Sequence, residues 1–141
     1  MAGTHFSIDT SGLEPLAARL RGLATMDTAA LMPRIGEHLL ASTRKRFSTE
    51  TAPNGAPWAA LKHPSRKKHK KDKILTLRGF LRGSGLRYQP EKRSVAVGTN
   101  LIYGATHQFG RDNIPARPFL GLSDADRAEL LEITLDWLRG R

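Results

Sequence analysis

The run Tyr103-Gly-Ala-Thr-His-Gln-Phe-Gly110, followed shortly by Ile114-Pro-Ala-Arg-Pro-Phe-Leu-Gly121, decides how the second half of this 141-residue chain folds. It holds three glycines, two prolines, three aromatic residues and one histidine. Glycine and proline at this density are typical of a chain that leaves a strand, turns sharply and enters a helix. We therefore predict a strand over Leu101 to Ala105. An extended loop is predicted over Gly110 to Pro118, where the prolines exclude a helix.

A helix is predicted directly after this run. Ser123 is a capping residue type, Asp126 follows it at the spacing of a capping box, and Asp124 favours the positive end of the helix dipole. The residues from Leu130 to Leu138 supply a broad apolar face, and the helix is expected to end at Arg139.

Before the run, the sequence predicts a β-hairpin. Leu86 and Tyr88, and then Val95 and Val97, alternate with polar residues on either side of a Pro90-Glu-Lys-Arg93 turn. Such alternation is typical of strands that bury one face only.

The N-terminal half is predicted to be helical. Apolar residues at helical spacing indicate helices over Leu13–Ala24 and Leu31–Phe47, and a shorter one over Ile74–Leu81 that glycines end. The predicted architecture is a single α+β domain over residues 1–141, with N-terminal helices, a small antiparallel sheet and a C-terminal helix.

A long loop is predicted over Ser48 to Ser65. Pro53-Asn-Gly55 reads as a turn, because proline presets φ and Asn-Gly accepts positive φ. Trp58 and Leu61 are expected to pack this loop on the core.

The net charge of +10 is distributed unevenly. The segment from Lys62 to Lys73 carries seven lysine or arginine residues against one aspartate, a net +6. It has no apolar face, so an exposed basic loop is predicted over about residues 62–73. Three interpretations stay open: a solvated loop, contact with an acidic protein surface, and salt-sensitive contact with nucleic acid. The candidate residues for an anionic partner are Arg66, Lys67, Lys68, Lys70, Lys71 and Lys73.

The residue types present exclude several kinds of chemistry. The chain has no cysteine, which excludes disulfides, thiolate metal sites and a thiol nucleophile. No pair of histidines has the spacing and the acidic third ligand of a metal site, so we predict no metal and no cofactor. No apolar run approaches the roughly 20 residues of a membrane span, so no membrane partner is expected. The first residues lack a secretory pattern, and synthesis is expected in the cytoplasm.

His107 is the one histidine in an ordered, glycine-flanked setting. It could hydrogen-bond a backbone carbonyl, pack at an interface, or serve a catalytic site whose acid only folding brings close. The glycines of Gly79-Phe-Leu-Arg-Gly83-Ser-Gly85 lack the Gly-Lys-Ser/Thr ending of a phosphate-binding loop. We predict that the protein is not an enzyme.

Five pieces of the chain stand in a recognisable order. They are Ile35-Gly-Glu-His-Leu-Leu40 with Thr43-Arg-Lys-Arg-Phe47, Pro53-Asn-Gly-Ala-Pro-Trp58-Ala-Ala-Leu61, Leu75-Thr-Leu-Arg-Gly79-Phe-Leu-Arg82, Val97-Gly-Thr99 with Tyr103 and His107-Gln-Phe-Gly110, and Ile114-Pro-Ala-Arg-Pro-Phe-Leu-Gly121 with Ser123 and Asp126. In this order they resemble the virion-morphogenesis or tail-completion proteins of Mu-like tailed bacteriophages. The resemblance extends from about Leu13 to Leu138.

The resemblance implies a structural virion protein that completes the head-proximal end of the tail and mediates head–tail joining. It implies a homohexameric ring in the neck region, assembled in the host cytoplasm. Its neighbours would be the tail tube or tail terminator protein and the head connector proteins, and the basic loop would contact an acidic neighbour or the DNA in the channel. The residues expected to shape these contacts are Trp58, Tyr103, His107, Phe109, Arg117 and Phe119. For Trp58 and Phe119, packing inside the chain stays an open alternative.

The rival hypothesis is a basic DNA-binding protein that acts outside the virion. This hypothesis predicts an affinity for duplex DNA that falls steeply as the salt concentration rises. A structural ring protein is predicted to bind duplex DNA weakly or not at all.

Overall fold

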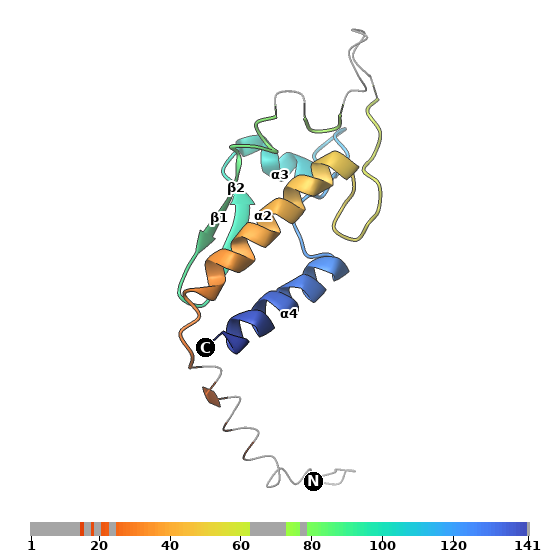
Figure 1. Ribbon diagram of the computed structural model, residues 1–141. Helices are drawn as coiled ribbons and strands as arrows, with labels where there is room; N and C mark the ends of the chain where they lie inside the picture. The colour runs from red at the N-terminus through yellow and green to blue at the C-terminus, as the bar shows by residue number, and fades with distance from the viewer. Residues whose placement is uncertain are drawn as a thin grey trace, which may run out of the picture.

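The computed structural model describes residues 15, 18, 21–22, 25–62, 73–76 and 79–140. Its elements, in order, are α2 (Leu31–Thr49), β1 (Leu86–Pro90), β2 (Val95–Thr99), α3 (Ile102–Phe109) and α4 (Asp124–Arg139). The helix α2 lies between the β1–β2 hairpin and α4 (Figure 1). This arrangement confirms the predicted α+β class. Most of the helix predicted over Leu13–Ala24 lies outside the described residues.

The helix α2 has 19 residues. It begins at Leu31 as predicted and ends at Thr49, two residues beyond the predicted end at Phe47. Pro33 stands in its first turn, where the missing N–H is not needed. Glu50 adopts a left-handed conformation (φ 57°) and its N–H donates to the carbonyl oxygen of Arg46, which ends the helix.

The predicted hairpin is confirmed, with Tyr88 paired to Val97 and Pro90 to Val95 in an antiparallel register. The hairpin packs closely on α2 at Gly36. A Cβ at this position would lie 2.4 Å from Cδ2 of Tyr88, so a larger residue would collide with the tyrosine ring.

The core lies at the C-terminal end of α2. Its buried members are Phe47, Trp58, Ile74, Leu81, Leu86 and Phe119. The ring of Phe47 packs edge-on against Trp58 at 5.4 Å and tilted against Phe119 at 5.5 Å between centroids. The core therefore joins α2, the loop after it, the start of the hairpin and the segment before α4.

The strand predicted over Leu101–Ala105 is wrong, because this segment begins α3. The β-branched and aromatic side chains of Ile102 and Tyr103 favour a strand by propensity. Tertiary contacts override that preference, since helical spacing turns Gly104 and Gln108 towards the body together.

The short helix predicted over Ile74–Leu81 is also wrong. The described residues there form turns, with left-handed φ values of 59° at Leu75 and 69° at Gly79. A right-handed helix cannot pass through such residues. The turns bring both Ile74 and Leu81 into the core.

The loop after α2 follows the prediction in part. Gly55 has a φ of 86°, and the N–H of Ala56 donates to the side-chain oxygen of Asn54, which confirms the turn. Trp58 is buried, but Leu61 is 37% exposed, so its predicted packing role is wrong. Arg117 holds this loop instead, through polar contacts described below.

Candidate assembly interface

One face of α3 fixes the helix to the body. A Cβ at Gly104 would lie 2.4 Å from Cγ2 of Thr99, so the helix approaches β2 closely there. One turn later, the Gln108 amide donates to the carbonyl oxygen of Leu120 and accepts from the N–H groups of Phe119 and Leu120. The helix is thus held at both ends, by glycine contact and by three hydrogen bonds.

The segment after α3 returns along the body as extended chain. Gly110 has a φ of 76°, and a Cβ there would lie 2.9 Å from the backbone nitrogen of Ala116. Arg117 is buried; its Nε donates to Ala59 and its Nη2 to Ala60, both at carbonyl oxygens. Its backbone N–H donates to the carbonyl oxygen of His107. Arg117 therefore ties the 58–60 loop to α3.

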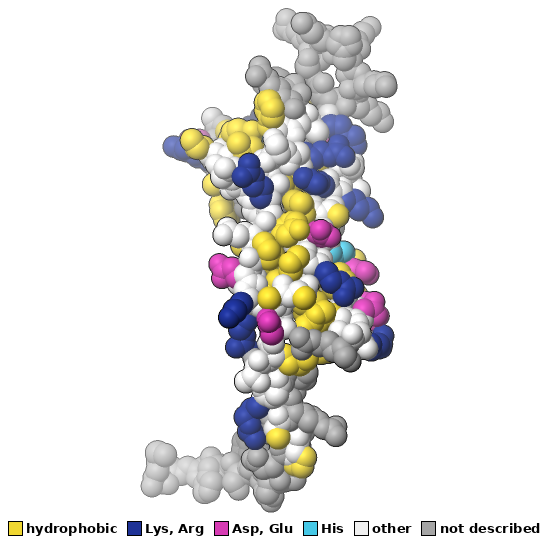
Figure 2. All heavy atoms as spheres, turned by 60° about the vertical axis from the view of Figure 1, so that its left-hand side comes forward, with side chains coloured by type: hydrophobic (Ala, Val, Ile, Leu, Met, Phe, Trp, Pro, Cys, Tyr) yellow, Lys and Arg dark blue, Asp and Glu magenta, His cyan; other side chains and the backbone are white. Residues whose placement is uncertain are grey.

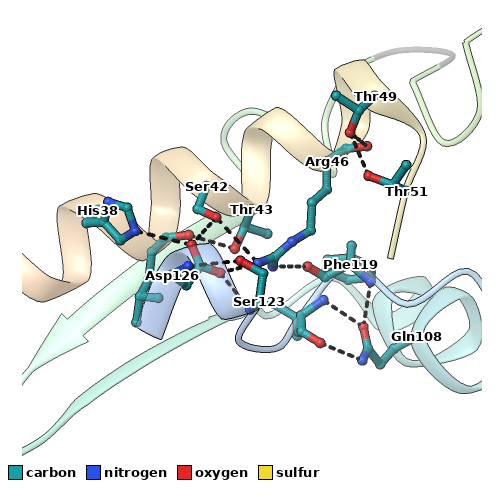
Figure 3. A network of polar contacts seen from close by, with 12 residues as sticks. His38, Ser42, Thr43, Arg46, Thr49, Thr51, Gln108, Phe119, Ser123 and Asp126 are labelled. Atoms are coloured by element: carbon teal, nitrogen blue, oxygen red, sulfur yellow. Dashed lines mark hydrogen bonds and ion pairs between the residues drawn. The ribbon is translucent and has the colours of Figure 1, made fainter. Parts of the chain in front are cut away.

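A buried ion pair connects α2, this segment and α4 (Figure 3). The guanidinium of Arg46 contacts the carboxylate of Asp126 and donates from Nη1 to the carbonyl oxygen of Phe119. Asp126 also accepts from Ser42 and contacts Nε2 of His38. We call Arg46, Asp126, Ser42 and His38 the Arg46–Asp126 cluster.

Asp126 also takes part in capping the N-terminal end of α4. Its N–H donates to the hydroxyl of Ser123 and its carboxylate accepts from the Ser123 N–H, which confirms the predicted capping box. Burial alone would raise the pKa of Asp126. The hydrogen bonds from Ser123 and Ser42 and the charge of Arg46 outweigh burial and lower the pKa to about 2. The carboxylate is therefore charged at neutral pH and holds α4 in place.

The opposite face of α3 points into solvent. Ile102 is 95% exposed and Phe109, seven residues on, is 79% exposed. Ala105 lies exposed between them, and Ile114, in the turn that follows this helix, is 44% exposed. We call Ile102, Ala105, Phe109 and Ile114 the α3 apolar face. Figure 2 shows hydrophobic side chains on one side of the molecule, in its upper part and in a run down its middle, with lysine and arginine beside them.

Such exposure makes the α3 apolar face a candidate interaction surface. Burying an isoleucine or phenylalanine side chain is favourable by about 1.5–3 kcal/mol. In the isolated subunit, both Ile102 and Phe109 remain exposed on one short helix and contribute no such stabilisation. Clustered apolar side chains rimmed by charge mark sites of protein contact, whereas single exposed ones need no explanation.

His107 lies at the side of α3. Its ring packs edge-on against Tyr103, with 6.0 Å between centroids. Its Nδ1 is buried without a hydrogen-bond partner among the described residues. Burial, and then the charge of Arg117, lower the pKa of His107, so the ring is neutral at pH 7.

The arrangement does not resemble a known catalytic or metal site within the described residues. No group of three potential metal ligands occurs there. His38 and Ser42 both contact Asp126, rather than forming the chain from nucleophile to base to acid that activates a serine. No described helix is long and apolar enough to cross a bilayer.

The structure divides the predicted contact residues by their exposure into three groups. Tyr103 and Phe109 are exposed, whereas Trp58, Arg117 and Phe119 are buried inside the subunit and His107 is half-buried. The indole N–H of Trp58 donates to the carbonyl oxygen of Pro118. The buried set can shape a contact surface only by supporting it.

Sequence reasoning missed Ile102 and Ile114 as surface residues, and Arg46 and Gln108 as supporting ones. The spacing of Ile102, Ala105 and Phe109 was the available signal for an exposed helical stripe. Arg46 and Asp126 are 80 positions apart in the sequence, so no local sequence pattern predicts their contact.

The basic residues predicted to meet an anionic partner lie mostly outside the described residues, namely Arg66, Lys67, Lys68, Lys70 and Lys71. Lys73 is exposed, and its Nζ donates to the carbonyl oxygen of Ser48. This contact anchors the C-terminal end of the basic segment to the end of α2.

Comparison with known proteins identifies the group to which the chain belongs. Residues 8–139 match the phage virion morphogenesis family. The chain is 31% identical over 135 residues to the Mu-like prophage FluMu G protein 1 of Haemophilus influenzae, covering 92% of this chain and 90% of that protein. It is 46% identical over 50 residues to FluMu G protein 2 of the same organism, covering 30% and 36%. No solved structure matches the chain. The chain belongs to the phage virion morphogenesis family and has a structural role in phage assembly.

Proposed function

We propose that this protein completes the head-proximal end of a phage tail and lets the finished tail join a DNA-filled head. It acts as a ring of identical subunits in the neck of the virion and is assembled in the host cytoplasm. The α3 apolar face is the observation that supports this proposal most. The chain belongs to a family of virion assembly proteins, and this face exposes clustered apolar side chains, as surfaces that bind other subunits do.

The proposed role requires no catalysis. The buried side chains of Arg46 and Asp126 join α2 to α4. Nδ1 of His107 is buried without a hydrogen-bond partner in the described part of the chain, so no acid orients the ring through this nitrogen as in a general base. In this proposal, the domain acts by holding its contact surfaces in fixed positions for neighbouring virion proteins.

The proposed neighbours are the tail tube or tail terminator protein on one side and the head connector proteins on the other. The basic segment over residues 62–73 would contact an acidic neighbour or the DNA in the channel, since its charge attracts both. A net charge of +10 also favours the second candidate, DNA binding outside the virion. That candidate expects the logarithm of duplex affinity to fall by about 0.9 per log unit of salt for each phosphate contacted.

Electron microscopy of a lysate from a phage or prophage with a null allele of this gene tests the proposal. Filled heads beside separate tails of normal length are expected. Overlong tails would move the role to length termination. Intact, infectious particles would overturn the proposal and leave DNA binding as the function to pursue.

A further inference from the structure

The hydrogen bonds of the β1–β2 hairpin fix which of its backbone groups face outward. Pro90 pairs with Val95, and the N–H of Glu91 donates to the carbonyl oxygen of Ser94. Because proline has no N–H, Pro90 and Val95 form a pair without mutual hydrogen bonds. Bonded and non-bonded pairs alternate along an antiparallel ladder. The residues whose N–H and carbonyl groups point away from the partner strand are therefore Leu86, Tyr88 and Pro90 on β1, and Val95, Val97 and Thr99 on β2.

The outer edge of β1 is protected against further pairing. Pro90 has no N–H to donate, and the N–H of Leu86 already donates to the carbonyl oxygen of Gly83. Tyr88 is then the one outward residue of β1 with an N–H to offer a partner strand. Arg87 adds a charge to this strand. Proline and charge are common means by which a protein keeps a strand edge from pairing with another chain.

The outer edge of β2 lacks this protection. The strand, Val95-Ala-Val-Gly-Thr99, has neither charge nor proline. Within the described residues, no backbone group outside the hairpin bonds to its outward N–H and carbonyl groups. The helix α2 packs over the face of both strands, with Gly36 against Tyr88 of β1, so it does not cover this edge. We call the outward backbone groups of Val95, Val97 and Thr99 the β2 edge.

We propose that the β2 edge pairs with the β2 edge of a second copy of this chain, antiparallel and about a two-fold axis at Val97. In this register Val97 lies opposite the same residue of the second copy, and Val95 lies opposite Thr99. Each outward residue then meets an outward residue, so every N–H and carbonyl group of both edges gains a partner. The side chains that meet are β-branched, and such cross-strand pairs stabilise a sheet.

The dimensions of the elements allow this pairing. Two neighbouring strands are about 10 Å wide, and a helix with its side chains is about 10–12 Å wide. One α2 therefore covers one hairpin, and the two copies form a four-stranded antiparallel sheet with their α2 helices side by side on one face.

The protected edge of β1 makes a second copy the fitting occupant. Pairing of the two β2 edges covers the open edge of both molecules at once. The outer strands of the joined sheet are then both β1, whose edge resists pairing because of Pro90. The contact is self-complementary and closes as a dimer, not as an open filament.

This dimer describes the protein before it enters the virion. A two-fold contact joins two subunits and cannot by itself build a ring with one subunit at each position. The dimer would keep the β2 edge from pairing with other chains until assembly. The inference does not rest on the proposed function, which the null-allele phenotype tests separately.

Val97→Pro is the variant that tests the contact. The N–H of Val97 points outward, so proline there removes hydrogen bonding to the second copy and none of the ladder with β1. Pro90 already holds an equivalent outward position on β1. Val97→Thr is the matched control, because it keeps both the N–H and the β-branched shape.

Size-exclusion chromatography with light scattering measures the mass of the purified full chain over a wide range of concentrations. Twice the mass of one chain is expected for the unmodified protein and for Val97→Thr, and the mass of one chain for Val97→Pro. Circular dichroism checks that Val97→Pro is folded. A monomeric unmodified protein at every concentration would overturn the inference, as would a dimer that persists in folded Val97→Pro.

Disulfide cross-linking decides the question even when Val97→Pro does not fold, because the chain has no cysteine of its own. In the proposed register Ala96 lies opposite Gly98 of the second copy, and a Cβ at Gly98 meets no atom within 4 Å. Oxidised Ala96→Cys with Gly98→Cys is expected to give covalent dimers and no larger species. The control, Arg87→Cys with Gln89→Cys, has the same spacing on β1 and is expected to stay monomeric. Monomers from the first pair, larger species from it, or equal dimer yields from both pairs would contradict the contact.

Discussion

Asp126→Asn is expected to destabilise the folded subunit by about 3–5 kcal/mol. The substitution keeps the shape of the side chain and removes its charge. Arg46, buried between α2 and the 119–126 segment, would then be an uncompensated cation. Urea unfolding followed by circular dichroism measures the free energy of unfolding by linear extrapolation.

Asp136→Asn is the matched control for this result. It makes the same chemical change in the same helix, but Asp136 forms an exposed pair with Arg139, with side chains 61% and 69% exposed. Exposed pairs contribute less than about 1 kcal/mol. Equal urea midpoints for the two variants would contradict the structural role given to the Arg46–Asp126 cluster.

The same carboxylate gives the unmodified protein an acid-sensitive stability. The pKa of Asp126 is lowered from 3.8 to about 2 in the folded chain. The unfolded chain therefore binds more protons between these two values, and stability falls as the pH is lowered from about 4 to about 2. Asp126→Asn should lose this part of the pH dependence.

Phe119→Ala is expected to cost about 3–5 kcal/mol, because it empties a fully buried site against the ring of Phe47. Phe109→Ala, ten positions earlier, removes the same ring from a site that is 79% exposed. It should change the free energy of unfolding by no more than about 0.5 kcal/mol. The comparison separates a residue that supports the subunit from one that faces outward.

Thermal and urea unfolding of the two phenylalanine variants check this difference. If Phe119→Ala were as stable as Phe109→Ala, Phe119 would not be the core residue that its contacts indicate. A large loss of stability in Phe109→Ala would instead place that ring inside the free subunit, and the α3 apolar face would lose its main member.

The predictable parts of the fold are those with a strong local pattern. Helical periodicity gave α2, strand alternation gave the hairpin, and Ser123 with Asp126 gave the start of α4. The errors fall where local and long-range preferences disagree. At Ile102, strand propensity competed with the contacts of Gly104 and Gln108, and the contacts determined the helix.

The candidate site was predictable only in outline. The aromatic and basic residue types of the 103–121 run pointed to contacts, and the structure leaves Phe109 exposed and buries Phe119. Residue type alone does not show whether a phenylalanine is buried or exposed. The sequence therefore did not distinguish the buried Phe119 from the exposed Phe109. Arg46 finds its partner only through the fold.

The most direct test of the assembly role uses Ile102→Asp, which places a charge at the most exposed position of the α3 apolar face. Gln89→Asp on the hairpin is its control, since it also adds one negative charge at an exposed site. Each variant is supplied to a phage with a null allele of this gene, and the lysate is examined by electron microscopy. The account expects filled heads beside separate tails with Ile102→Asp, and joined infectious particles with Gln89→Asp. Joined, infectious particles with Ile102→Asp would contradict it.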